Sequence, residues 1–349
     1  MKEKWSVAQI NDWYAAQPWF VGCNYVPADA VNSVEMWSKA TFNPELIRKE
    51  LTRAAEIGMN TVRVFLPYIV WKEEGPVFME TFETFLQIAD ACGHRVLPIL
   101  FDDCAFDQGA DPVYGPQPDP VPGVHNSRWV PSPGFKVQDD PAQLVSCKAY
   151  VDALVGTHKD DNRILAWDLY NEPGNSNRIL DCLPLLRYVF KWARANDPAQ
   201  PLTSSLWAYT DSCAVVNLLL LELSDIVGLH TYGTNYQALI EKYAALDRPI
   251  FVTEWMHRPN ENTILSMLPL FCQKKIGVWN WGLYQGRCQT HLSWETMRLG
   301  ATPTLDTDTN ATPADKPLPT LWQHDLLYPD GTPYMPEEIE LMQKLTNRL

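Results

Sequence analysis

The feature that most constrains the fold of this chain is an alternation of short apolar runs with amphipathic helical segments, which continues from about residue 18 to about residue 282. This rhythm is typical of parallel β/α units, in which each strand is followed by a crossover helix. Eight units in one chain predict an α/β fold that closes as a (β/α)8 TIM barrel. The expected strands are Trp19–Tyr25, Asn60–Leu66, Val96–Phe101, Ile164–Tyr170, Pro201–Leu206, Asp225–His230, Ile250–Thr253 and Gly277–Trp281.

Local signals support the helices between these strands. Asn43 followed by Pro44 is a typical helix start, since Asn caps the first free N–H groups and Pro fits the first turn. Gly93 is a typical helix end. Barrels commonly exceed 250 residues as one unit, and we see neither a linker nor an internal repeat beyond the β/α alternation. We therefore expect residues 1–349 to form one catalytic domain, with a last helix over Glu337–Leu349 in the outer ring.

Two long irregular segments rich in Pro, Gly and Asp interrupt the rhythm after the third and the eighth strand. They are Asp102–Asp140 and Leu283–Pro336. Irregular segments of this length inside a compact domain are either functional or disordered. Both leave the carboxyl ends of strands, where barrel enzymes carry their active sites, and this favours lids or walls of a binding site.

Composition and charge exclude several classes of partner. The net charge of −14 and the pI near 4.9 argue against nucleic acid and anionic membrane surfaces, and no run of Lys and Arg provides a local exception. The eight cysteines stand singly and no metal-binding motif occurs, so we expect no metal and no cofactor. The first twenty residues lack the apolar core of a signal peptide, which favours a cytoplasmic protein, or a periplasmic or secreted one if a signal was removed. The oligomeric state is not readable from the sequence.

Two glutamates follow strands that lie on opposite sides of an eight-stranded barrel. Glu172 ends the fourth strand, and Glu254 ends the seventh. Because side chains alternate along a strand, we expect Glu172, Tyr170 and Asp168 to share one face. A pair of carboxyl groups over one barrel mouth is what glycoside hydrolysis requires. Their separation decides between retention and inversion of configuration, and sequence does not measure it.

At this point the chain, over about residues 18–335, resembles the clan of retaining (β/α)8-barrel glycoside hydrolases, and within it family 5, the cellulase- and mannanase-like enzymes. No single motif decides the resemblance, but each stands at its expected strand and their order is specific. The motifs are Gly22-Cys23-Asn24-Tyr25, Asn60-Thr61-Val62-Arg63, Asn171-Glu172-Pro173, His230-Thr231-Tyr232, Thr253-Glu254-Trp255 and Val278-Trp279-Asn280-Trp281-Gly282.

The resemblance implies a retaining β-glycosidase that works through a covalent glycosyl-enzyme intermediate, with carbohydrate as its partner. Glu172 would be the general acid/base and Glu254 the nucleophile. Asn171 would bind the sugar 2-hydroxyl, and Arg63 and Tyr232 would hold Glu254 ionised and oriented. Arg63 has a second interpretation, a buried ion pair with the carboxylate expected deeper in the barrel, Asp168. Asn24 is expected among the residues around the sugar.

Other polar and aromatic residues are candidates for the substrate site. We expect His230 to contact substrate, Trp279 to be the sugar platform, and Trp281 to be either a second platform or barrel packing. After the third strand, where family 5 has a histidine, this chain has Asp102 and Asp103, and we expect one of them to bind sugar hydroxyls instead. In the loop after the eighth strand, the group Arg287, Gln289, His291 and Trp294 is either a subsite or a surface loop.

Several functional alternatives stay open. Within the glycosidase interpretation an exo-acting or oligosaccharide-cleaving enzyme is favoured over an endo-β-1,4-glycanase of the cellulase, mannanase or xylanase type. Transglycosylation would use the same intermediate. A sugar-binding barrel without activity would be expected to lack one of the two carboxylates, and a phosphate-handling barrel would need Gly-rich loops after strands seven and eight. The sugar and its linkage are not fixed by fold resemblance.

Overall fold

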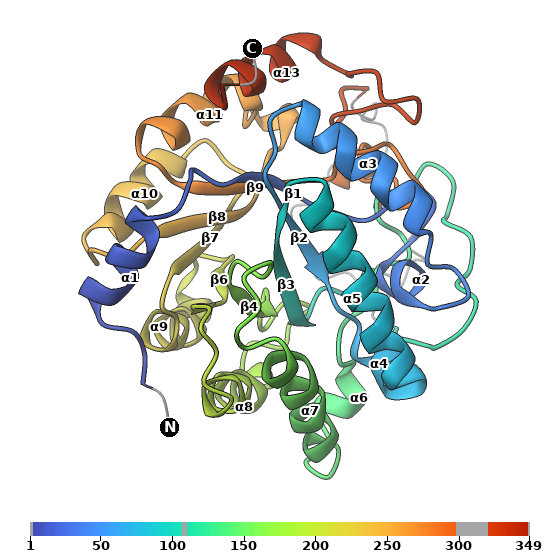
Figure 1. The fold of residues 1–349 in the computed structure, drawn as a ribbon, viewed down its shortest axis with the longest axis vertical. Coiled ribbons are helices and arrows are strands. Elements are labelled where there is room, and N and C mark those ends of the chain that lie inside the picture. The colour runs from blue at the N-terminus through green and yellow to red at the C-terminus, as the bar shows by residue number, and fades with distance from the viewer. Residues whose placement is uncertain (1–2, 107–109, 298–319, 348–349) are drawn as a thin grey trace.

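The computed structural model, which describes residues 3–106, 110–297 and 320–347, has a closed parallel barrel at its centre. Its strands pair side by side in the order β5-β4-β3-β2-β1-β9-β8-β7-β6. The two ends of this order, β5 and β6, are consecutive halves of one segment interrupted at Ser204. They count as one strand of the barrel, so the sheet closes as an eight-stranded barrel, and the predicted (β/α)8 fold is confirmed (Figure 1).

All eight expected strands are present, with boundaries shifted by up to three residues. The fifth expected strand is the one that is split, and Gly277–Trp281 agrees at both ends. The strands are β1 (Val21–Asn24), β2 (Thr61–Phe65), β3 (Arg95–Asp102), β4 (Trp167–Asn171), β5 (Leu202–Thr203), β6 (Ser205–Leu206), β7 (Val227–Thr231), β8 (Ile250–Trp255) and β9 (Gly277–Trp281).

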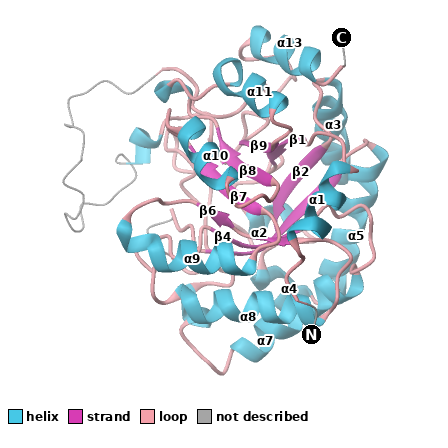
Figure 2. Ribbon diagram, turned by 90° about the vertical axis from the view of Figure 1, so that its left-hand side faces the viewer, coloured by secondary structure: helices cyan, strands magenta, loops and turns pink. Residues whose placement is uncertain are grey.

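Helices surround the barrel on the outside, as seen along its axis in Figure 1 and from the side in Figure 2. The α-helices are α1 (Val7–Ala15), α2 (Ser33–Trp37), α3 (Pro44–Glu56), α4 (Tyr68–Glu74), α5 (Pro76–Ala91), α6 (Phe135–Gln138), α7 (Leu144–Val151), α8 (Cys182–Ala195), α9 (Ala214–Leu223), α10 (Tyr236–Ala244), α11 (Ile264–Gln273) and α13 (Pro336–Leu345). Within the described residues there are also three 3-10 turns and one π-helical segment: η1 (Asp152–Gly156, π), η2 (Asp211–Cys213), η3 (Arg258–Asn260) and η4 (Trp294–Thr296).

The predicted helix signals are met in the structure. The Asn43 side chain accepts a hydrogen bond from the backbone N–H of Leu46, and Pro44 opens α3. Helix α5 ends at Ala91, and Gly93 lies just beyond it with φ +82°, a conformation that glycine adopts without strain. The last helix, α13, covers most of the predicted range. Of the helices in the described ranges, none is long and apolar enough to cross a lipid bilayer.

An aromatic layer seals the barrel at the amino ends of its strands. Ile10 and Tyr14 of α1 belong to a buried cluster with Phe20, Phe251 and Trp279. The ring of Tyr14 lies 5.6 Å from that of Phe251, and the ring of Phe251 lies 5.0 Å from that of Trp279. Helix α1 therefore forms the floor of the barrel, and a substrate site can open only at the carboxyl ends of the strands.

Candidate active site

Glu172 stands one residue beyond the end of β4 and lines a cavity of about 430 Å3. Its φ is +43°, so the backbone leaves the extended conformation at this residue and strict alternation no longer sets the direction of its side chain. The expectation that Asp168, Tyr170 and Glu172 share one face is wrong for Tyr170, whose ring packs against Phe101 and does not line the barrel mouth. Asp168 bonds to Arg63 inside the barrel, whereas the Tyr170 hydroxyl donates to Asp103.

Glu254 lies near the end of β8, across the same cavity. The pairing of β7 with β8 shifts by one residue here, so that Leu229 faces Val252 but His230 faces Glu254. Bulges of this kind are frequent beside active sites, where they redirect a side chain. The shift brings His230 and Glu254 to the same level of the barrel mouth.

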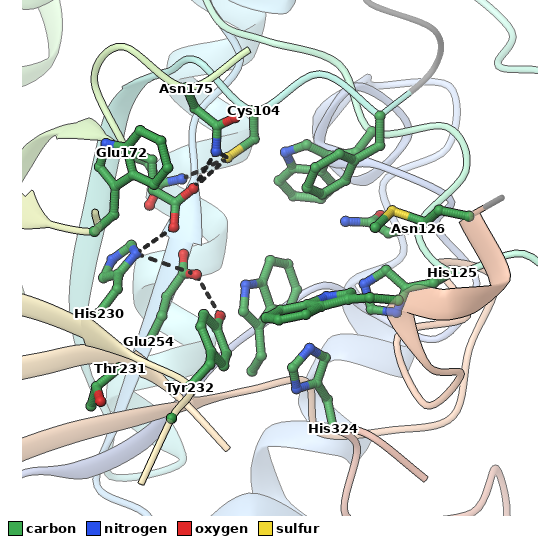
Figure 3. A pocket seen from close by; sticks show the side chains of 18 of the residues that line it. Cys104, His125, Asn126, Glu172, Asn175, His230, Thr231, Tyr232, Glu254 and His324 are labelled. Carbon is green, nitrogen blue, oxygen red and sulfur yellow. Dashed lines mark hydrogen bonds and ion pairs between the residues drawn. The ribbon is translucent and has the colours of Figure 1, made fainter. Parts of the chain in front are cut away.

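The two glutamates and His230 form one compact cluster, which is visible in Figure 3. An oxygen of Glu172, an oxygen of Glu254 and a ring nitrogen of His230 all lie within 4.8 Å of one another. The Nδ1 atom of His230 is 2.7 Å from Glu172 Oε1 and 3.5 Å from Glu254 Oε2. The other oxygen of Glu172 accepts hydrogen bonds from Cys104 Sγ at 3.1 Å and from Asn175 Nδ2 at 2.5 Å.

Arg63 holds Glu254 from below. Its NH1 donates to Glu254 Oε1 at 2.9 Å and to Asn24 Oδ1 at 2.7 Å. Its NH2 donates to Asn171 Oδ1 at 2.6 Å and pairs with Asp168 Oδ2 at 2.8 Å. Both sequence interpretations of Arg63 are therefore realised together, because one planar guanidinium reaches the deeper carboxylate and the upper one. Arg63 is fully buried, so it positions groups of the site and does not face the cavity.

Burial dominates the protonation of the cluster. It raises the pKa of Glu172, against hydrogen bonds from Cys104 and Asn175 and the charge of Arg63. Burial also raises the pKa of Glu254, and the charge of Glu172 adds to this. The charge that His230 carries when protonated, the charge of Arg63 and a 2.6 Å hydrogen bond from the Tyr232 hydroxyl act in the opposite direction. Arg63 and Tyr232 therefore act as expected on Glu254, but burial outweighs them.

His230 is neutral at pH 7. Burial lowers the pKa of its imidazole to about 4. A neutral imidazole between two carboxyl groups can carry its proton on Nδ1 and donate it, or accept a proton there from Glu172. His230 lines the cavity as expected.

The two strand-eight tryptophans lie at different depths. Trp279 has no exposed surface and packs in the floor layer, where its Nε1 donates to Thr61 Oγ1 at 3.3 Å. The expectation of Trp279 as sugar platform is wrong, because α1 and the floor residues enclose it. Trp281, two residues further on, lines the cavity and packs against Phe65 and Trp129.

The acidic residues after β3 also differ from the expectation. Asp102 is buried and accepts from Trp129 Nε1 at 2.7 Å and from Asn171 Nδ2 at 2.9 Å. Asp103 is buried and accepts from the Gly174 N–H at 2.7 Å. Neither lines the cavity, so direct binding of sugar hydroxyls by either is wrong here. Burial raises the pKa of Asp102 to about 6 and that of Asp103 to about 7.

Two further candidates lie outside the cavity. Asn24 is fully buried between Arg63 and the backbone carbonyl of Thr253, to which its Nδ2 donates at 2.8 Å. Arg287 reaches Glu35 at 3.5 Å and Asp119 at 3.2 Å. The proposed sugar contacts of Asn24 and Arg287 are therefore not supported by the structure. Asn171 and Tyr232 do line the cavity.

Both long irregular segments contribute walls to the cavity, as the sequence predicted. The segment after β3 provides Cys104, Phe106, His125, Asn126 and Trp129, and the described part of the segment after β9 provides Trp294, Met297 and His324. We did not single out most of these side chains from the sequence, although Trp294 stood in a candidate subsite. Their place depends on loop packing that carries no periodic signal.

Two clusters of described residues bring histidine and carboxylate atoms close enough for a metal ion. In the first, Glu83 and Asp161 already accept hydrogen bonds from Arg163. In the second, Glu172–His230–Glu254, both oxygens of Glu254 accept hydrogen bonds, from Arg63 and Tyr232. Neither cluster offers a free set of ligand atoms.

Solved structures with a similar fold include a mannosidase and a mannanase. The GH5_18 protein of Streptomyces cattleya in complex with Manβ1-4GlcNAc has a TM-score of 0.62 at 15% identity, with 94% of this chain and 80% of that chain covered. An exo-β-1,4-mannosidase of Opitutaceae bacterium strain TAV5 has a TM-score of 0.62 at 17% identity, with coverages of 94% and 60%. This chain has the fold of these enzymes.

An endo-β-1,4-mannanase of Thermotoga petrophila is also similar, with a TM-score of 0.58 at 14% identity and coverages of 96% and 77%. No protein-family model matches the sequence, and a search of curated proteins gives no match. Because all these identities are low, the likeness establishes the barrel, and the chemistry has to be argued from the site.

Proposed function

We propose that this protein is a retaining β-glycosidase of the family 5 type that removes single sugars from the ends of β-linked glycans. The observation that carries the proposal is the separation of Glu172 and Glu254. Their nearest carboxyl oxygens lie within 4.8 Å. A gap of about 5–5.5 Å between the carboxyl groups fits direct attack and retention, whereas inversion needs about 6.5–9.5 Å to admit a water molecule.

In the first step of the proposed mechanism, an oxygen of Glu254 attacks the anomeric carbon. The bond from that carbon to the glycosidic oxygen breaks, and the proton of Glu172 passes to the leaving oxygen. In the second step a water molecule attacks the anomeric carbon, gives a proton to Glu172 and releases Glu254. The raised pKa of Glu172 suits the acid of the first step.

The attack by Glu254 requires its ionised form. Arg63 and Tyr232 contact its two oxygens separately, at 2.9 and 2.6 Å, and so favour the charge on Glu254 over the charge on Glu172. The same contacts fix the carboxylate in place. Both effects lower the cost of reaching the transition state, because Glu254 begins the attack already ionised and already oriented.

The junction between the two long segments favours exo action. The segments after β3 and β9 are joined by hydrogen bonds, including Asn126 N–H to Cys288 O at 2.9 Å and His125 N–H to Thr296 Oγ1 at 2.8 Å. This junction lies at the side of the cavity opposite Glu172 (Figure 3), and it supports the proposal that a glycan does not continue in that direction. Because the similar structures include a mannosidase and a mannanase, β-mannosides are the first substrates to test.

The test compares the wild type with Glu172→Ala and Glu254→Ala on aryl β-glycosides of mannose, glucose, xylose and galactose, with and without azide. Loss of Glu172 should lower the rate on the order of 10²–10⁴-fold. Azide should then give a β-glycosyl azide with Glu172→Ala and an α-glycosyl azide with Glu254→Ala. Glu50→Gln is the matched control, since Glu50 is equally buried but pairs with Tyr25 on the other side of β1.

Either glutamate variant with near-full activity would refute the assigned pair. Endo action would be recognised by internal cleavage of mannan without release of monosaccharide. A wild type that binds these glycosides and cleaves none of them would favour the sugar-binding barrel.

A further inference from the structure

Building on the proposed function, we propose that Asn126, together with His125, binds the hydroxyl groups at the end of the sugar ring farthest from the anomeric carbon. The site would then accept one terminal sugar whose far hydroxyl is free, and it would reject a glycan that continues beyond that position. This assigns a specificity role to a loop residue that carries no catalytic signal in the sequence.

The side chain of Asn126 is built for a ligand. Asn126 is 2% exposed and lines the cavity, yet its Oδ1 is buried without a hydrogen-bond partner among the described residues. A buried polar atom without a partner costs about 1–3 kcal/mol. A turn of the side-chain amide about its own axis would bring Oδ1 to the cavity, where a sugar hydroxyl can donate to it and remove this cost.

The backbone conformation of Asn126 also suits asparagine at this position. Its φ of +44° lies in the left-handed region, which asparagine tolerates better than most residues. Its N–H donates to Cys288 O at 2.9 Å, and its carbonyl accepts from the Trp129 N–H at 3.1 Å. The backbone that carries the amide is therefore held at a fixed position beside the cavity, which lowers the ordering cost when a ligand binds.

His125 supplies a second hydrogen-bonding group, the Nε2 atom of its imidazole ring. Its Nδ1 lies 2.7 Å from the Leu292 carbonyl oxygen, which can only accept, so the ring proton is on Nδ1. Burial lowers the pKa of His125 to about 4 and keeps the ring neutral at pH 7. The Nε2 atom is then an acceptor for a sugar hydroxyl. Asn126 and His125 together offer both acceptors and donors, which suits a hydroxyl group and not an anion.

The position of the pair selects the far end of the sugar. Figure 3 shows Asn126 and His125 on the side of the cavity opposite Glu172. The glycosidic oxygen must lie at Glu172 and the anomeric carbon at Glu254, so the ring extends away from Glu172. The aromatic side chains Phe65, Trp129 and Trp281 form a cluster at the mouth beside this path.

The wall behind Asn126 is braced in several places. The Gln289 side chain donates to the carbonyls of Val121 and Val124 at 2.8 and 3.0 Å, and accepts from the Gly123 N–H at 3.0 Å. These bonds tie the turn that carries Asn126 to the segment after β9. In this proposal, a glycan that continued beyond Asn126 would meet this braced wall.

The experiment is a thermodynamic cycle that combines the Asn126→Gly variant with substrates that lack one hydroxyl group. Glycine keeps the left-handed backbone and removes only the amide. The substrates are the preferred aryl β-glycoside and its 4-deoxy and 6-deoxy analogues. We expect Asn126→Gly to lower kcat/KM on the parent about 10-fold or more, and to have less than a 3-fold effect on one deoxy analogue. Asn235→Gly, another asparagine of the cavity lining, should not couple to the same hydroxyl.

The same cycle is measured by calorimetry with sulfur-linked aryl glycosides, which bind without being cleaved. If the effects of Asn126→Gly and of hydroxyl removal on binding are coupled, but the wild type does not cleave the oxygen-linked glycosides, the glycosidase function is refuted and the role of Asn126 stands. Turnover by the wild type, with equal losses on all three substrates or no loss at all, would overturn the role of Asn126 and leave the function intact.

Discussion

Replacement of Arg63 by methionine is the perturbation with the largest expected effect on the barrel. The guanidinium contacts two carboxylates, Asp168 at 2.8 Å and Glu254 at 2.9 Å, and the side chains of Asn24 and Asn171. All of these groups are nearly or fully inaccessible to solvent. Methionine fills similar space but leaves both carboxylates without their cation.

Removal of one partner from a buried ion pair costs about 3–5 kcal/mol, because the remaining charge stays desolvated. We therefore expect Arg63→Met to lower the free energy of unfolding by about that amount near pH 7.5. Glycosidase activity should fall as well, since Glu254 loses the contact that favours its charged form.

The loss should depend on pH in a defined direction. Without Arg63, the pKa values of Asp168 and Glu254 in the folded protein lie further above their unfolded values of about 3.9 and 4.3. The loss is absent where both carboxyl groups are protonated in the two folded proteins. It grows as pH rises through their raised pKa values in the folded wild type, because the unfolded values are the same in both proteins. The difference between wild type and variant should therefore be at least ~1 kcal/mol smaller near pH 5 than near pH 7.5.

The assay is guanidinium chloride unfolding followed by circular dichroism at both pH values. Arg287→Met is the control, because Arg287 is 36% exposed at its side chain and its pairs should contribute at most ~1 kcal/mol. Arg63→Lys keeps a charge and serves if the methionine variant does not fold. A loss below ~1 kcal/mol, or one that is equal at the two pH values, would refute this account of the barrel's polar layer.

Two further predictions concern the lining of the cavity. Cys104 donates to Glu172, and burial raises the pKa of its thiol far above the ordinary value, so it acts as a neutral donor. Cys104→Val should raise the pKa of Glu172 by about 0.5–1 unit and move the alkaline limb of the kcat/KM profile to higher pH. Cys104→Ser should move that limb to lower pH. If the alkaline limb of the profile stays unchanged in both variants, the Cys104 hydrogen bond does not influence the pKa of Glu172. Trp281→Ala should raise KM on the order of tenfold through loss of an aromatic contact, whereas Trp279→Phe should lower the free energy of unfolding by roughly 1–3 kcal/mol with KM unchanged. The reverse pattern would restore Trp279 as the platform.

The sequence by itself determined the barrel and the two glutamates at its mouth. Both are readable because they rest on short-range periodicity, in which apolar runs of strand length alternate with amphipathic helices. The position of Glu172 and Glu254 at strand ends then follows from the fold, because the carboxyl ends of parallel strands meet at one rim. The resemblance to family 5 rested on motifs placed at those same ends.

The tertiary structure alone decided the depth and direction of the remaining side chains. Period-two alternation tells which face a residue takes but not its level, so Trp279 and Trp281 were indistinguishable until α1 was seen to close the floor beneath Trp279. Beyond a strand end, direction depends on the turn, which buries Asp103 and brings Cys104 to the cavity. Loops carry no periodic signal, because their conformation is fixed by hydrogen bonds between segments far apart in the chain.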